Sequence, residues 1–301
     1  MKKFPSRRQI SGLSMVEIMV SMVIGIVVVA AVLVSYLSSG KTSKQQAAFA
    51  EMHENAQMAL TLLSRDLLLA GYAQVSGVAA AVPPSTTTTF NRTFSGNAVF
   101  GCDNGFVTAN TTGAVACASA AGAPSIEISY EADTTNTVPS SGVPSDCKGA
   151  QIRPAVVSPA VGNYYVTHNR YFLATGSSGR SELYCASATQ DVSGGAVGAE
   201  PLVDNVEAMK IWYGVAVAAN PRQVVRYVTA GNVGVGEWPR VVSVRVCILV
   251  RSSEPVIDME LYSGGSTPKY LDCDSAEQTI TDRFLRTAYF STTTLRNKMA
   301  L

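Results

Sequence analysis

The feature that most constrains this chain is an uncharged, apolar run near its N-terminus. Residues 18–40 carry no charged side chain and are mostly Val, Ile, Met, Ala and Leu. About 20 such residues span a bilayer as a helix, so the run predicts a membrane-spanning segment. The preceding residues 1–12 contain four basic side chains and no acid. This positive flank predicts a cytoplasmic N-terminus, with the rest of the chain across the membrane.

One acidic residue, Glu17, stands immediately before the apolar run. A carboxylate costs about 2.5–3.5 kcal/mol at the centre of a membrane helix and less near the interface. Glu17 therefore either has a partner or lies in the headgroup zone beside the basic leader. A plain signal anchor and a removable signal peptide cut near residues 35–39 are the alternatives. The hydrophobic core of a removable signal is only about 7–15 residues long, and this run is longer.

Residues 7–18 read RRQISGLSMVEI, so Gly12 ends the basic leader and Glu17 is the fifth residue after it. This string resembles the class III signal of type IV prepilins. The resemblance implies cleavage after Gly12 by prepilin peptidase and N-methylation of Leu13, where major pilins usually have Phe. It also implies that the Glu17 carboxylate of one subunit neutralises the N-terminal amine of its neighbour. In hydrocarbon, such pairing offsets a desolvation cost that neither charge could bear alone.

From Lys41 the chain becomes polar but keeps a helical spacing of apolar residues. One amphipathic face is formed by residues that recur every three or four positions: Phe49, Met52, Ala56, Ala59, Leu63, Leu67 and Ala70. No proline interrupts residues 13–70, and Gly71 provides a C-terminal stop. A helix over these 58 residues would be about 87 Å long. A coiled-coil dimer is the alternative for its second half.

Residues 59–72 read ALTLLSRDLLLAGY. Similar strings mark the PilW-like minor pilins and the related pseudopilins of type II secretion. Further strings resemble PilW-like sequences, at residues 202–207, 211–215, 244–246, 249–252 and 292–297 and around Arg286, whereas residues 73–200 resemble them poorly. The Arg65–Asp66 pair either orients the helix end on the globular domain or is a solvated charge pair worth little.

The remainder of the chain predicts a β-rich domain. Residues 125–131 alternate, with Ile126, Ile128 and Tyr130 on one face, and residues 242–250 alternate in the same way. Weaker strand candidates are residues 164–174, 206–215 and 224–229. The expected fold is α+β and type IV pilin-like, with a long N-terminal helix packed on a C-terminal antiparallel β-sheet head. Its expected divisions are a leader (1–12), a transmembrane or filament-core helix (13–40), an amphipathic continuation (41–71) and the head (72–301).

Six cysteines all lie beyond the membrane segment: Cys102, Cys117, Cys147, Cys185, Cys247 and Cys273. An even number on the exported side indicates up to three disulfides in an oxidising periplasm, although six cysteines permit 15 connectivities. Sequential pairing is the expected one, 102–117, 147–185 and 247–273. Metal binding is the rival interpretation, but the chain has no C-x-x-C motif and only two histidines.

The sequence offers little for catalysis, and the expectation is a protein that is not an enzyme and has no cofactor. His53 falls in the predicted helix and His168 in a predicted strand. The chain has no nucleophile elbow, Walker loop or zinc-protease motif. Asp272, Asp274 and Asp282 suggest calcium only superficially, because the loop lacks the glycine that an EF-hand needs at its sixth position.

Charge sets a limit on the partners. Only 15% of the residues are charged, against about 25% in an ordinary soluble domain. The whole chain has a net charge of +1, and without its basic leader it has 19 basic and 22 acidic residues, a net charge of −3. General nucleic-acid binding requires a clearly basic domain, so it is not expected here.

The resemblance implies a minor pilin that joins other minor pilins in a complex priming type IV pilus assembly and sits at the tip. It would support adhesion, twitching motility or DNA uptake. The implied partners are prepilin peptidase, the other minor pilins, the major pilin and the inner membrane, with a periplasmic head before incorporation into the surface pilus. Two alternatives stay open: a GspJ-like type II secretion pseudopilin, and a membrane-anchored periplasmic module that binds a ligand.

Overall fold

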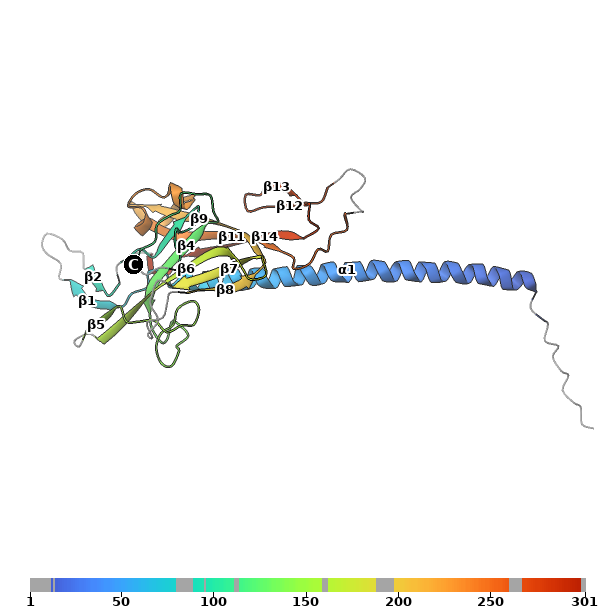
Figure 1. Cartoon of the computed structure of the whole chain (residues 1–301). Helices are drawn as coiled ribbons and strands as arrows, with labels where there is room; N and C mark the ends of the chain where they lie inside the picture. The colour runs from blue at the N-terminus through green and yellow to red at the C-terminus, as the bar shows by residue number, and fades with distance from the viewer. Residues whose placement is uncertain are drawn as a thin grey trace, which may run out of the picture. The chain divides into compact units, whose positions relative to one another are not determined.

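The computed structural model describes most of the chain, namely residues 12, 14–79, 89–94, 96–110, 114–158, 162–187, 198–259 and 267–298. The chain divides into two compact units, residues 1–47 and residues 48–301. One helix, α1 (Met15–Leu69), contributes residues to both units (Figure 1). The long N-terminal helix predicted from the uninterrupted spacing of apolar residues is therefore confirmed.

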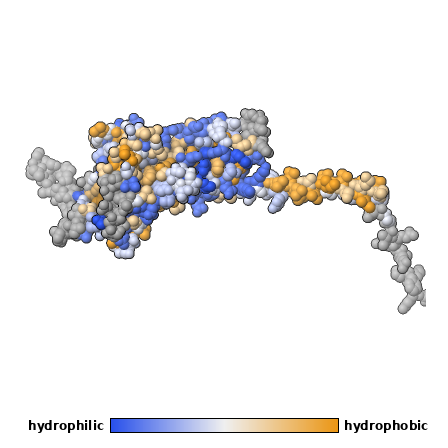
Figure 2. Space-filling view, viewed as in Figure 1, coloured by the Kyte–Doolittle hydropathy of each residue, from blue (hydrophilic) through white to orange (hydrophobic). Residues whose placement is uncertain are grey.

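In the first unit, α1 is apolar and exposed. Large side chains such as Ile24, Val28 and Leu33 are more than half exposed, because no other described part of this unit covers them. Figure 2 shows this stretch of the helix in orange, the colour of apolar residues. By length and composition α1 can cross a membrane, in agreement with the sequence.

In the second unit, one face of α1 is buried. The buried side chains follow the predicted three- and four-residue spacing: Met52, Ala56, Ala59, Leu63 and Leu67, with Ala48 and Leu60 in addition. Phe49 is an exception, because 48% of its surface is exposed. Adjacent helical residues point about 100° apart, so the burial of Ala48 turns Phe49 away from the core.

The strands form two main antiparallel sheets and two small hairpins. The six-stranded sheet has the order β3-β4-β6-β7-β8, with β5 pairing β6, and the four-stranded sheet has the order β10-β9-β11-β14. The hairpins are β1-β2 and β12-β13. The bounds are β1 Val75–Ala79, β2 Thr89–Arg92, β3 Val99–Cys102, β4 Ser125–Ala132, β5 Val156–Ser158, β6 Gly162–Thr175, β7 Ser181–Ser187, β8 Ala199–Asp204, β9 Val206–Val217, β10 Asn220–Val228, β11 Val241–Arg251, β12 Lys269–Leu271, β13 Glu277–Thr279 and β14 Arg286–Thr294.

The two strongest strand predictions correspond to β4 and β11. In β11, alternate residues such as Val244, Val246 and Ile248 are buried in the main core, and Arg245 on the opposite face is exposed. β11 is central in its sheet, since Val246 pairs with Ile211 of β9 on one side and with Ser291 of β14 on the other.

The chain passes from one main sheet to the other at a single residue, Asn205. β8 ends before it and β9 begins after it. Asn205 is buried and has a φ of 60°, a left-handed conformation that asparagine tolerates better than most residues. Its carbonyl accepts the N–H of Arg251 at 2.9 Å, which ties this crossing to the end of β11.

One hydrophobic core joins α1 to both main sheets. Its buried members include Leu63 and Leu67 of α1, Ile126 and Ile128 of β4, and Val246 and Ile248 of β11. Burial of each such side chain is worth about 1.5–3 kcal/mol. The structure thus confirms the predicted α+β class, with a long N-terminal helix and antiparallel strands packed on its C-terminal part. The division of the strands into two main sheets is a feature that the sequence pattern did not indicate.

Candidate functional site

The N-terminal end of α1 is a capping arrangement built from Ser14 and Glu17. The carbonyl of Ser14 accepts the N–H groups of Glu17 at 3.0 Å and of Ile18 at 3.2 Å, so Ser14 is the N-cap residue. The N–H of Ser14 in turn donates to Oε2 of Glu17 at 3.4 Å. This is one half of a capping box, in which an acid at the third helical position satisfies the N–H of the cap. Sequence analysis missed this role, although the S-x-x-E spacing is its signal.

The other residues of the predicted leader junction are only partly described. Gly12 is exposed, and an added Cβ there would meet no atom within 4 Å. Leu13, the predicted N-methylated residue, lies outside the described residues. Glu17 is exposed, so its carboxylate is accessible to a partner as well as to the helix end. Cleavage at Gly12, methylation of Leu13 and pairing of Glu17 with a neighbour stay predictions.

Near the other end of α1, Asp66 is buried in a network of polar side chains. Its Oδ2 accepts hydrogen bonds from the Tyr171 hydroxyl and from Nδ2 of Asn169, both at 2.6 Å. Its Oδ1 accepts the Tyr130 hydroxyl at 3.1 Å. Arg65, by contrast, is exposed. The solvated charge pair is therefore wrong for Asp66, which joins α1 to β4 and β6.

Burial and the hydrogen-bond network change the pKa of Asp66 in opposite directions. Burial raises the pKa of Asp66, while the hydrogen bonds from Tyr171, Asn169 and Tyr130 oppose that shift. Burial costs the charged form its hydration, whereas donors stabilise it. A cavity of about 130 Å³ reaches Asp66 and is also lined by Arg65 and Asp146. Through these contacts the buried carboxylate of Asp66 positions α1 against β4 and β6. Asp66 lies outside the apolar segment of residues 18–40.

The C-terminal end of α1 is capped from the far end of the chain. Nδ2 of Asn297 donates to the carbonyls of Leu68, Leu69 and Ala70 at 3.2, 3.3 and 3.5 Å. These are carbonyls that a helix end leaves without an intrahelical partner. Gly71 has a φ of 72°, the left-handed conformation of a helix stop, as the sequence predicts.

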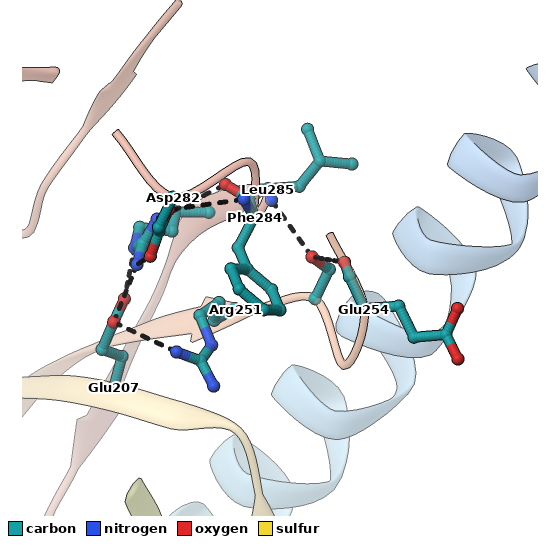
Figure 3. Close-up of polar contacts among 8 residues, drawn as sticks. Glu207, Arg251, Glu254, Asp282, Phe284 and Leu285 are labelled. Atoms are coloured by element: carbon teal, nitrogen blue, oxygen red, sulfur yellow. Dashed lines mark hydrogen bonds and ion pairs between the residues drawn. The ribbon is translucent and has the colours of Figure 1, made fainter. Parts of the chain in front are cut away.

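An ion-pair cluster connects the ends of three strands (Figure 3). Arg286 donates to both oxygens of Asp282 at 2.7 and 2.6 Å, and to both oxygens of Glu207 at 2.5 and 3.0 Å. The hydrogen bonds that Arg286 donates to Asp282 lower the pKa of that carboxyl to about 2. The guanidinium of Arg251 lies 4.4 Å from the centre of the Phe284 ring. Because Arg286 occupies both carboxylates, this cluster is a structural clamp between β9 and β14.

The cysteines form three disulfides, each closing a short segment of the second unit. They join Cys102 to Cys117, Cys147 to Cys185, and Cys247 to Cys273, with Cα–Cα distances of 5.2, 6.4 and 5.8 Å. This is the sequential order expected from the sequence. Each such bridge contributes about 2–4 kcal/mol to stability.

Among the described residues, the neighbours of the two histidines do not have the geometry of a Ser–His–acid relay. His53 lies on α1, where its ring centre is 5.8 Å from that of Tyr289. Nδ1 of His168 is 2.7 Å from Oγ of Ser129 and 3.7 Å from the carboxylate of Glu127. A Ser–His–acid relay needs the serine and the acid on opposite ring nitrogens, and here both approach the same one.

The acidic residues considered for calcium are held by the protein. Asp272 accepts backbone N–H groups of its own turn, at 2.8 and 3.0 Å. Asp274 pairs with Lys210, and Asp282 pairs with Arg286. Among the described residues, no group of three or more His, Cys, Asp or Glu side chains could hold a metal ion.

In a comparison with known proteins, part of the second unit matches a protein family. Residues 170–297 match the family model of the type IV pilus-assembly protein W, PilW. That region is similar to PilW. The match confirms the predicted resemblance over these residues. A type IV-like pilin from Thermus thermophilus is 12% identical, with a TM-score of 0.39, over 84% of this chain and 97% of its own. No curated protein matches the chain.

The PilW-like region contains much of the framework described above. Asn205, the ion pair of Glu207 with Arg286, and the helix cap Asn297 all lie within residues 170–297. Tyr171, which binds Asp66, is near the start of the same region. The residues of the leader junction lie outside it, so their roles rest on their own chemistry and on their resemblance to prepilins.

Proposed function

We propose that this chain is a minor pilin of the type IV pilus, part of a minor-pilin complex that primes filament assembly and sits at the tip. In this role it supports adhesion, twitching motility or DNA uptake. The observation that carries the proposal is a single chain that combines two features. Its exposed apolar helix begins at Met15 and carries Glu17, an acid five residues after Gly12, in its first turn, and its residues 170–297 match a pilus-assembly family.

In the proposed mechanism, prepilin peptidase removes residues 1–12 and Leu13 becomes the methylated N-terminus. Residues 13–40 hold the subunit in the inner membrane and later in the filament core, residues 41–71 continue the helix, and residues 72–301 form the periplasmic head. The exposed apolar side chains of α1 require lipid or other helices around them. The role needs no catalysis, cofactor or metal.

Glu17 has two roles in this proposal, and a substitution that removes the charge but keeps a hydrogen-bond acceptor separates them. In the single chain it accepts the N–H of Ser14. During assembly it also neutralises the N-terminal amine of a neighbouring subunit. A glutamine at this position keeps an acceptor for the cap, since capping boxes use Glu or Gln, but it carries no charge.

The test compares Glu17→Gln with Glu17→Ala in the bacterium that makes the protein. We expect both variants to be processed after Gly12, and both to be depleted about tenfold or more from sheared pili, because a lost ion pair in hydrocarbon exceeds 1.4 kcal/mol. Immunoblots of pili and membranes measure the two pools. Normal incorporation of Glu17→Gln, with only Glu17→Ala depleted, would reduce Glu17 to a helix cap and contradict the proposed pairing.

A further inference from the structure

A groove runs beside α1 in the second unit and has a volume of about 540 Å³. Side chains of α1 line it together with Phe290 and Ser291 of β14 and with Asn136. The α1 residues are Gln57, Leu60, Thr61, Ser64, Arg65, Leu68 and Leu69. The groove is thus bordered by a helix on one side and by a sheet edge on the other.

That sheet edge is β14, which pairs only with β11 among the described strands. Two hydrogen bonds just beyond the ends of β14 show which of its residues direct their N–H and C=O groups to β11. The N–H of Leu295 donates to Val242 at 2.8 Å, and the carbonyl of Leu285 accepts from Ser252 at 2.9 Å. In an antiparallel pair every second residue bonds to the partner strand. Odd-numbered residues of β14 therefore bond to β11, and even-numbered residues point their N–H and C=O groups to the free edge.

Within the described residues 288–294, the free edge of β14 lacks three common devices that block another strand. Edges are commonly blocked by lysine, proline or a β-bulge. Residues 288–294 read AYFSTTT, and their pairing with β11 is continuous, without a bulge. Phe290 and Thr292 are exposed residues, and by this alternation their backbone N–H and C=O groups point away from β11.

One charged side chain lines the groove, Arg65. It is exposed, and no carboxylate in the described part of the chain forms an ion pair with it. Pairing of two β14 edges from two copies of this chain would bring two such arginines to one interface, which is unfavourable. A different chain with a carboxylate at this position fits the charge.

We propose that the groove between α1 and β14 receives an extended, acid-bearing segment of a different pilin subunit, which adds a strand to β14. Main-chain hydrogen bonds to residues 288, 290, 292 and 294 supply the affinity. Arg65 and the apolar floor at Leu60 and Leu68 select the segment. This inference rests on the proposed function, because it takes the partner from the same pilus complex.

The test uses the full-length chain in its own bacterium, with the photoreactive residue p-benzoylphenylalanine at position 61 and, as control, at position 222 on β10, the opposite edge of the sheet. Crosslinked peptides are mapped by mass spectrometry. We expect position 61 alone to crosslink to one extended segment of another pilin that contains an acid.

The same crosslink is then measured in variants of the groove. Thr292→Pro removes an outward N–H, a change that edge strands tolerate, and should lower the yield of the crosslink about tenfold. Thr292→Ala should not change it, and Arg65→Glu should lower it where Arg65→Lys does not.

The outcomes separate this inference from the proposed function, because the N-terminus and pilus content of the same samples are measured. A chain that starts at Leu13 and enters pili, but gives no crosslink from position 61, overturns the groove proposal alone. Equal yields from Thr292→Pro and Thr292→Ala, or crosslinks to a second copy of this chain, also overturn it. A chain that keeps its leader and is absent from pili overturns both.

Discussion

Glu17 and Asp66 are acids on one helix in opposite surroundings. Glu17 is exposed and accepts one backbone N–H, whereas Asp66 is buried and accepts three side-chain hydrogen bonds. The buried position fixes the rotation of α1 against β4 and β6, because only one rotation presents the carboxylate to all three donors. The exposed position leaves the Glu17 carboxylate accessible, as the proposed pairing with a neighbouring subunit requires.

Asp66 predicts a pH dependence of stability. Its folded pKa lies above the unfolded value of 3.8, so the folded state binds the proton more tightly. The stability gained from this is complete below about pH 4 and is lost as the pH rises through the folded pKa. The difference in unfolding free energy between wild type and Asp66→Asn should therefore decline from pH 4 to pH 7. Urea unfolding in detergent at each pH measures it.

The matched control is Thr61→Ala, which changes an exposed, uncharged residue of the same helix. Its effect should stay within about 0.5 kcal/mol at every pH, as for most surface substitutions. Asp66→Ala should cost about 3 kcal/mol or more at pH 7, because three buried donors lose their acceptor. A wild-type advantage over Asp66→Asn that grows with pH would show that the hydrogen bonds outweigh burial.

At the scale of elements, the C-terminal tail stabilises the end of α1. Asn297 follows β14 and reaches the last carbonyls of the helix. The contact joins parts of the chain more than 220 residues apart in sequence. The segment that ends β14 therefore also holds the C-terminal end of α1 in place.

Replacing Asn297 with alanine tests this contact. We expect the free energy of unfolding to fall by about 1 kcal/mol, the usual value of a capping hydrogen bond. The control is Asn220→Ala, since Asn220 is exposed and its side chain donates to the nearby Gln223 at 3.0 Å. Hydrogen exchange at residues 66–70 should also accelerate in the Asn297 variant. Unchanged exchange there would mean that Gly71 and the core hold the helix end without this cap.

The sequence predicted the elements whose pattern is local. The spacing of Met52, Ala56 and Leu63 predicted the helix and its buried face, and alternation predicted β4 and β11. What it could not predict depends on contacts between distant residues. Asp66 is buried because Tyr130, Asn169 and Tyr171 come from two other strands. Phe49 was expected on the buried face, but its exact rotation depends on packing that spacing alone does not give.

The candidate site divides in the same way. The Ser14–Glu17 cap and the Gly12 junction are adjacent in sequence, so a local motif can indicate them. The Glu207–Arg286 clamp joins residues 79 positions apart, and the groove beside β14 brings together the two ends of the second unit. The clamp and the groove both depend on the order of the strands in the sheets. The sequence pattern predicts several of these strands only weakly, so it does not give their order.

At the scale of the whole molecule, an exposed apolar helix and a disulfide-bonded β domain belong to one chain. In the proposed function, lipid covers the helix before assembly and other helices cover it afterwards, because large exposed apolar surfaces are unstable in water. A retained basic leader would keep four positive charges at the helix start. Charges of that kind are costly in a filament core of packed apolar helices. We therefore propose that the leader must be removed before the helix can move from lipid into a filament.

Gly12→Val tests that condition. An added side chain at Gly12 meets nothing within 4 Å, so the fold should survive while the peptidase loses access to the scissile bond. We expect the variant to keep residues 1–12, to remain in the membrane and to be depleted from pili about tenfold or more, a difference of at least 1.4 kcal/mol. The control is Gly25→Ala, which also meets open space and should be processed to Leu13. The intact mass of each purified variant shows whether residues 1–12 are still present. A wild-type chain that starts near residues 35–39 would instead identify a removable signal, and it would separate the β domain from any filament.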